Sequence, residues 1–174
     1  MQSVKVVVTG PFNAGKTTFI KSVSEITVLS TEREVTDSPS AAGGETTVAM
    51  DFGRITISDD VVLYIFGTPG QERFSFMWET LSEGMLGFVL LVDATDESSM
   101  GDAAAIVSFF RNMSSVPFVI AANRVGIDDE GLASIHERLG IEPSVEVLAV
   151  DARDRESVKN VLLALLYRIL ESME

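Results

Sequence analysis

The sequence contains no cysteine, and its 174 residues include one histidine and one tryptophan. The absence of cysteine excludes disulfide bonds and every metal site built on thiolates. The one histidine, His136, lies far in the sequence from the glycine-containing loops discussed below, so we interpret it as a surface or partly packed residue. Any chemistry assigned to this chain must therefore work without a thiolate.

Basic residues are scarce, with 13 Lys and Arg against 26 Asp and Glu, and the formal net charge is -13. Nucleic acids and anionic membranes are bound through basic patches, so we expect neither as a partner. No apolar run is long enough to span a bilayer, and we find neither a secretory signal nor a lipidation motif. We therefore expect a cytoplasmic protein without a direct membrane anchor. The length and the 46% hydrophobic content indicate a single packed domain over residues 1–174.

The most informative stretch is residues 4–18, VKVVVTGPFNAGKTT. Its valine-rich start predicts a buried strand, and Gly10 to Thr17 then reads G-x-x-x-x-G-K-T before an apolar segment with helical spacing. A strand, a glycine-bounded loop and a helix start are the context of a phosphate-binding loop. Its backbone N–H groups line an anion-sized concavity, Lys16 reaches the outer phosphates and the hydroxyl of Thr17 binds magnesium. The stretch therefore predicts a nucleotide-phosphate site.

Apolar patterns predict the remaining elements. Strands are expected at 47–57, 61–66, 84–93, 117–122 and 145–150, and helices at 17–24, 98–112, 132–139 and 158–169. The short connection 58–60 makes the first two of these strands an antiparallel hairpin, and Asp154 is the expected N-cap of the last helix. Residues 28–45 are expected to form a long loop, either an ordinary surface excursion or a segment ordered by a ligand, and their position favours the second.

Strands that alternate with helices, interrupted by one hairpin, predict an α/β fold. We expect a doubly wound, mostly parallel six-stranded sheet with one antiparallel edge strand. Ligands of such sheets bind beyond the carboxyl ends of the strands, where Gly10, Gly67 and Asn123 all fall. The loops that begin at these three residues are therefore expected to lie together at one edge of the sheet.

Three segments carry a resemblance to a known family. They are GPFNAGKTTFI (10–20), TTVAMDFG (46–53) and FGTPGQERF (66–74). In this order they resemble the Ras-like small GTPases, and in detail a prokaryotic branch whose members are often described only as ATP/GTP-binding proteins. The resemblance covers nearly the whole chain. It implies a small G-domain that binds GTP or GDP with Mg²⁺.

The resemblance also implies residue roles. Gln71 would orient the attacking water, and Gly70 would offer its N–H to the γ-phosphate. Thr17 and Thr47 would bind magnesium, with Thr46 as the alternative to Thr47. Nucleotide-binding residues would be Asn13, Ala14, Gly15, Lys16, Thr17, Thr18, Gly70, Asn123, Arg124, Ala152 and Arg153, and the catalytic residues would be Gln71 and Lys16. Phosphoryl transfer depends mainly on positioning and charge stabilisation, so this set is sufficient.

Three of the four departures from the family pattern bear directly on metal binding, turnover or base specificity, and the fourth is Pro69, which stiffens the loop before Gly70. Gly67 stands where the family's D-x-x-G motif has an Asp, and we expect Asp51 not to replace it, because Asp51 lies about 13 Å along the strand from Thr47. Phe12 stands where Ras often has glycine, and its ring is expected to crowd Gln71 and slow the turnover.

The third departure concerns the base. The family's N-K-x-D motif reads Asn123-Arg124-Val125-Gly126 here, without the Asp that accepts hydrogen bonds from guanine. Asp128 is one substitute, and capping of the next helix is the alternative role for it that we favour. Discrimination between guanine and adenine is therefore left open.

The leading hypothesis is a nucleotide-dependent switch that hydrolyses GTP slowly to GDP and phosphate. The alternatives are a catalytically weak nucleotide-binding scaffold without strict guanine specificity, and an ATP-using enzyme. By family analogy a protein effector or regulator is expected as partner, either a roadblock-type regulator or a sensor kinase. The aromatic and Met side chains at 74–78 are either part of such a partner surface or a cover for the core.

Overall fold

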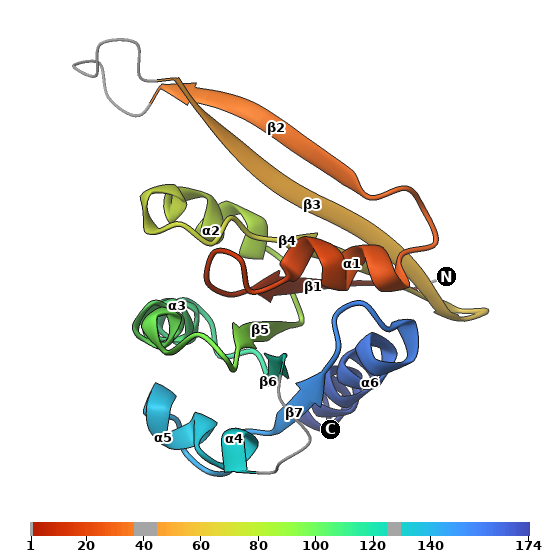
Figure 1. Cartoon of the computed structure of the whole chain (residues 1–174). Coiled ribbons are helices and arrows are strands. Elements are labelled where there is room, and N and C mark those ends of the chain that lie inside the picture. The colour runs from red at the N-terminus through yellow and green to blue at the C-terminus, as the bar shows by residue number, and fades with distance from the viewer. Residues whose placement is uncertain (1, 37–44, 125–129) are drawn as a thin grey trace.

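A computed structural model describes residues 2–36, 45–124 and 130–174 of the chain, with side chains described outside 29–49 and 130–131 (Figure 1). The strands are β1 Gln2–Thr9, β2 Leu29–Thr36, β3 Glu45–Ser58, β4 Val61–Gly67, β5 Gly87–Asp93, β6 Phe118–Asn123 and β7 Val147–Val150. The α-helices are α1 Lys16–Val23, α2 Phe76–Ser82, α3 Met100–Met113, α4 Glu130–Ala133, α5 Ile135–Leu139 and α6 Arg155–Ser172. Short 3₁₀ turns cover Glu72–Phe74 and Glu97–Ser99.

Seven strands of the described part of the chain form one sheet in the order β2-β3-β4-β1-β5-β6-β7. β3 is antiparallel to both of its neighbours, β2 and β4. The other neighbouring pairs, β4–β1, β1–β5, β5–β6 and β6–β7, are all parallel. The predicted α/β class and mostly parallel sheet are confirmed. The β3–β4 hairpin is also confirmed, with its turn at residues 59–60.

One strand was not predicted. β2 lies within 28–45, where a loop was expected, and it adds a seventh strand outside β3, so β3 is antiparallel but does not form the edge. The segment LSTEREVT carries little apolar character, and it becomes a strand through backbone pairing with β3 over eight residue pairs. Residues 37–44 of the expected loop lie outside the described residues.

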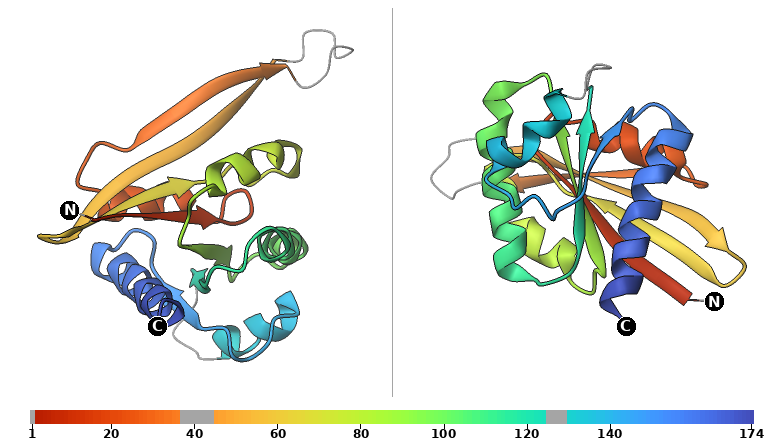
Figure 2. Two further views of the ribbon diagram at one scale, coloured as in Figure 1. Left: turned by 180° about the vertical axis from the view of Figure 1, so that it is seen from behind. Right: turned by 90° about the horizontal axis from the view of Figure 1, so that it is seen from below.

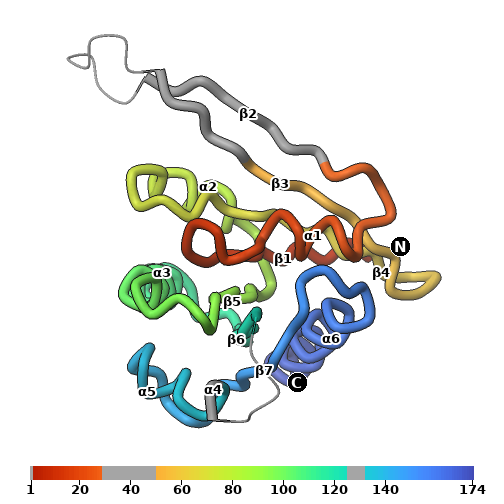
Figure 3. Tube along the Cα trace, viewed as in Figure 1, coloured from red at the N-terminus to blue at the C-terminus, as the bar shows by residue number. Residues whose placement is uncertain are grey.

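Helices cover both faces of the sheet. α1 and α6 lie on one face and α2, α3 and α5 on the other (Figures 1 and 2), and Figure 3 traces the chain through these two layers. Each face has its own apolar core, one around Phe19, Leu63 and Leu165 and one around Phe88, Phe110 and Ile135. β5 is buried along almost its whole length, because a central parallel strand is covered on both sides.

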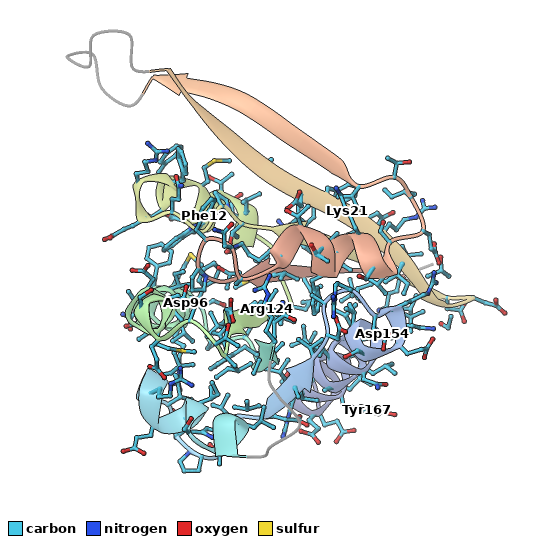
Figure 4. All side chains as sticks on the ribbon, viewed as in Figure 1. Phe12, Lys21, Asp96, Arg124, Asp154 and Tyr167 are labelled. Atoms are coloured by element: carbon cyan, nitrogen blue, oxygen red, sulfur yellow. The ribbon has the colours of Figure 1, made fainter. Side chains whose placement is uncertain are left out.

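The last helix follows the predicted pattern. Its inward residues recur at three and four positions, and the buried ones are Val158, Val161, Leu162, Leu165 and Ile169. Asp154 occupies the N-cap position as predicted, although its side chain makes no capping hydrogen bond. Tyr167 points outward from this helix and is 66% exposed (Figure 4). None of the helices in the described residues is long and apolar enough to cross a membrane.

Candidate functional site

The loop between β1 and α1 holds its shape through unusual backbone conformations. Gly10, Asn13 and Gly15 have φ angles of 151°, 66° and 106°, in the region that glycine and asparagine tolerate best. A Cβ atom at Gly10 would lie 2.1 Å from the carbonyl oxygen of Leu91, so no larger residue fits there. The loop ends at Gly15, the N-cap of α1, as the G-x-x-x-x-G-K-T motif predicts.

Lys16 is held beneath this loop. Its amino group donates hydrogen bonds of 2.7 Å to the carbonyl oxygens of Gly10 and Pro11, and the residue is only 9% exposed. Burial lowers the pKa of Lys16 to about 8, although the nearby carboxylate of Asp51 raises it in opposition. The result is a buried amino group held against the phosphate loop, a position suited to binding an anion.

Thr17 contacts a carboxylate that comes from another strand. Its hydroxyl donates a hydrogen bond of 2.6 Å to Oδ2 of Asp51, and Asp51 is 8% exposed. We expected Asp51 not to replace the carboxylate that is missing at Gly67, because Asp51 lies far along the strand from Thr47. Asp51 is the register partner of Gly67 across β3 and β4, so the two lie side by side. The separation of Asp51 from Thr47 along the strand does not report this cross-strand proximity.

The loop after β4 packs directly on the phosphate loop. A Cβ at Gly70 would lie 2.4 Å from the backbone nitrogen of Phe12, so only glycine permits this approach. The indole N–H of Trp78, in α2, donates a hydrogen bond of 2.8 Å to the carbonyl oxygen of Pro69 and so ties the loop to this helix. Gln71 lies beside it and accepts a hydrogen bond of 2.9 Å from Nε of Arg73.

These two loops enclose a pocket of about 400 Å³. Its lining joins the phosphate loop, α1, β3 and the loop after β4, and comprises Phe12, Asn13, Gly15, Lys16, Thr17, Thr18, Asp51, Thr68, Pro69, Gly70, Gln71, Arg73, Phe74 and Arg124. Phe12 is 60% exposed at this pocket, on the side of the molecule where α2 lies (Figure 4). The pocket therefore offers amides, a lysine and hard oxygen atoms to a ligand.

A second pocket of about 540 Å³ shares Thr18 and Arg124 with the first. It is lined by Thr18, Asn123, Arg124, Val150, Asp151, Ala152 and Arg153, so it contains all four residues predicted to lie at the base. Arg124, labelled in Figure 4, donates a hydrogen bond of 3.1 Å to the carbonyl oxygen of Asn13 and one of 2.9 Å to the carboxylate of Asp93. Burial disfavours the charged form of Asp93, but hydrogen bonds from Thr95 and Arg124 hold its pKa below the usual value.

Asn123 joins the phosphate loop to the loop after β7. It is 4% exposed, its amide nitrogen donates 3.0 Å to the carbonyl oxygen of Ala14, and its amide oxygen accepts 3.2 Å from the N–H of Ala152. Arg153 pairs with Asp151 at 3.1 Å on the surface, and hydrogen bonds from Arg153 hold the pKa of Asp151 below its usual value. Asn123 thus positions the phosphate loop, and Arg153 lies at the rim.

The structure brings most of the predicted site residues together at one edge of the sheet. Thr47 lies on β3 opposite Glu34, but its side chain and that of Thr46 lie outside the described part, as do residues 125–129 with Gly126 and Asp128. Sequence reasoning missed Asp93, although it ends a predicted strand at the site edge. Groups of three or more metal-binding His, Asp or Glu side chains are absent from the described residues.

The aromatic segment after Gln71 is divided between core and surface. Phe74 and Trp78 are 3% and 4% exposed, whereas Phe76 is 57% exposed. Two of the aromatic residues therefore cover the core, and Phe76 alone of the three rings faces outward. His136 is partly buried and contacts the carbonyl oxygen of Val145 at 2.6 Å, as expected of a packed residue.

Comparison with known families identifies the family to which this chain belongs. Residues 28–172, most of the chain, match a family described as conserved hypothetical ATP binding protein. The chain belongs to this family. The match begins after the phosphate loop, so the loop is identified from its own motif and geometry.

Relatives of the family member described here include Ras-related proteins. An uncharacterized protein of Methanocaldococcus jannaschii is 28% identical over 76% of this chain and 77% of its own length. Mouse Rab-3C is 28% identical over 73% of this chain, and Arabidopsis thaliana RABE1e is 28% identical over 69%. The chain covers 59% of the length of each of these two Ras-related proteins. The resemblance to Ras-like, P-loop proteins is confirmed.

Proposed function

We propose that this chain is a small G-domain over residues 1–174 that binds GTP or GDP with Mg²⁺, hydrolyses GTP slowly and acts as a nucleotide-dependent switch. The observation that carries the proposal is the pair of adjoining pockets that share Thr18 and Arg124. Lys16 lines one pocket and Asn123 lines the other, so the two adjoining pockets suit a phosphate chain and a base on one ligand.

The roles follow from chemistry at each position. Lys16 and the loop amides bind the phosphates, and Thr17 supplies a hydroxyl oxygen to Mg²⁺, an ion that typically combines few protein ligands with substrate phosphates. When bound, Mg²⁺ would neutralise charge on the phosphate oxygens. Gly70 would donate its N–H to the terminal phosphate, and Gln71 would orient water. Thr47 remains our proposed second hydroxyl ligand.

Slow turnover is supported by two observations. The amide oxygen of Gln71 already accepts a hydrogen bond from Arg73, which competes with water positioning. The Phe12 ring borders the same pocket. A regulator that moves Arg73 or the segment with Phe76 would release Gln71, so we propose a protein regulator or effector as partner.

The family description favours a second candidate, a nucleotide-binding scaffold without strict guanine specificity. Gly126 takes the place of the acid that reads guanine in the resembling proteins, and the family is described as ATP binding. In this version Asn123, Arg124 and Ala152 hold the loops together and read no exocyclic group of the base.

Two measurements test the proposal. Calorimetric titration with GDP and ADP, each with Mg²⁺, should give tighter binding of GDP, and equal affinities would favour the scaffold without guanine specificity. Single-turnover phosphate release from GTP should exceed that of Lys16→Ala over hours. Binding without release above this control would leave a scaffold and reject the enzyme.

A further inference from the structure

The side chain of Asp51 occupies space that a residue larger than glycine at position 67 would enter. A Cβ at Gly67 would lie 3.2 Å from Cβ and 3.4 Å from Oδ2 of Asp51, and 2.9 Å from Cδ1 of Ile20. Residues opposite each other on neighbouring strands present their side chains to the same face of a sheet. Asp51 and position 67 therefore serve the same volume beside α1, and Asp51 fills it.

Asp51 also contacts the residue that such a carboxylate would serve. Its Oδ2 accepts a hydrogen bond of 2.6 Å from the Thr17 hydroxyl, and Asp51 lines the same pocket as Lys16 and Thr17. A hydroxyl has one proton and two acceptor lone pairs, so a carboxylate that accepts the hydrogen bond leaves the lone pairs of Thr17 free for a cation. Groups that orient a ligand in this way also raise its basicity.

We propose that Asp51, reaching across from β3, is the carboxylate that supports the Mg²⁺ ion bound by Thr17 and the nucleotide phosphates. Gly67 lacks a side chain because Asp51 takes that space. This inference rests on the proposed nucleotide function and adds to it a positioning residue on a different strand. In this proposal the site keeps a carboxylate, which comes from Asp51 on β3 in place of a residue at position 67 on β4.

A purely structural role for Asp51 makes a different prediction. In that case the carboxylate only balances the buried charge of Lys16, whose pKa it raises, and holds Thr17 in place. Asp51→Asn separates the two roles, because an amide keeps the shape and an acceptor for the Thr17 hydroxyl but removes the charge that attracts a divalent cation. Asp59→Asn is the matched control, because Asp59 is exposed in the β3–β4 turn and the charge change is the same.

The test measures retention of a fluorescent guanosine diphosphate at a series of free Mg²⁺ concentrations, with EDTA as the metal-free point. We expect the Mg²⁺ midpoint of Asp51→Asn to rise by about tenfold or more, the range for residues that orient metal ligands. Affinity in EDTA should be kept or increased, because a negative charge beside the phosphates is removed. Asp59→Asn should match the wild type.

The outcomes are distinct. A wild-type midpoint in Asp51→Asn overturns this inference alone, while nucleotide binding by the wild type keeps the proposed function. Failure of the wild type to bind nucleotide overturns both. Loss of binding by Asp51→Asn in EDTA as well as in Mg²⁺, in a folded variant, overturns the inference in favour of the structural role.

Returning the carboxylate to position 67 gives a second test. In the double variant Asp51→Gly with Gly67→Asp, the contact with the old Asp51 side chain disappears, and the remaining close atom is the flexible end of Ile20. We expect its Mg²⁺ midpoint to return to within a few-fold of the wild type, whereas Asp51→Gly alone stays weak. A folded double variant that behaves like Asp51→Gly contradicts this proposal.

Discussion

The side-chain nitrogen of Asn123 lies 3.0 Å from the carbonyl oxygen of Ala14, and its oxygen lies 3.2 Å from the backbone nitrogen of Ala152. One buried amide therefore joins the phosphate loop, the end of β6 and the loop that leads to α6. A residue that the resemblance assigns to the base therefore also connects three segments of the fold. These hydrogen bonds hold the segments of the site together without a ligand.

The first prediction follows from these bonds. Asn123→Ala should lower the free energy of unfolding of the nucleotide-free protein by about 2 to 4 kcal/mol, because two buried partners lose their hydrogen bonds. Chemical denaturation without nucleotide measures this. The control Asn112→Ala, on the exposed side of α3, should leave the stability nearly unchanged. Wild-type stability in Asn123→Ala would restrict Asn123 to ligand contact.

A pair of glycine substitutions should act in opposite directions. Gly70→Ala should destabilise by about 1 to 3 kcal/mol, because its Cβ would meet backbone atoms of the phosphate loop that cannot move aside cheaply. Gly101→Ala, in α3 with nothing within 4 Å of its Cβ, should stabilise by about 0.5 to 1 kcal/mol through a better helix. Equilibrium denaturation compares the stabilities of the two variants. Equal effects would show that the loop after β4 does not pack closely on the phosphate loop.

Phe12→Ala should raise the single-turnover rate of GTP hydrolysis several-fold, because the ring borders the pocket that contains Gln71. The stability should change by no more than about 0.5 kcal/mol, since Phe12 is 60% exposed. Phe76→Ala is the matched control, because Phe76 is similarly exposed but does not line the pocket. An unchanged or slower rate in Phe12→Ala would remove crowding as the cause of slow turnover.

The surface pair of Arg111 and Glu142 predicts a pH dependence. Hydrogen bonds from Arg111, one of 2.9 Å, lower the pKa of Glu142 from 4.5 to about 2. A carboxyl whose pKa is depressed by folding stabilises the protein fully above its unfolded pKa, so this contribution is lost as the pH falls from about 4.5 towards 2. Carbon NMR titration should show the pKa of Glu142 returning towards 4.5 in Arg111→Gln. The same low pKa in this variant would assign the shift to another cause.

Much of the fold could be predicted, because apolar periodicity reports burial directly. The valine run of β1 and the three-and-four spacing of α6 mark segments whose side chains must face a core. β2 could not be predicted this way. Its segment has no continuous apolar face, and pairing of its backbone with β3, decided elsewhere in the chain, makes it a strand.

The sequence by itself determined the phosphate loop and the residue types of the site, because Gly10, Gly15, Lys16 and Thr17 act through local backbone geometry within one short segment. Only the tertiary structure decided which carboxylate meets Thr17. Asp51 and Gly67 are 16 positions apart in the chain, and the antiparallel register of β3 and β4 places them side by side. Distance along one strand cannot report this, because a cross-strand neighbour is fixed by hydrogen-bond register and not by sequence separation.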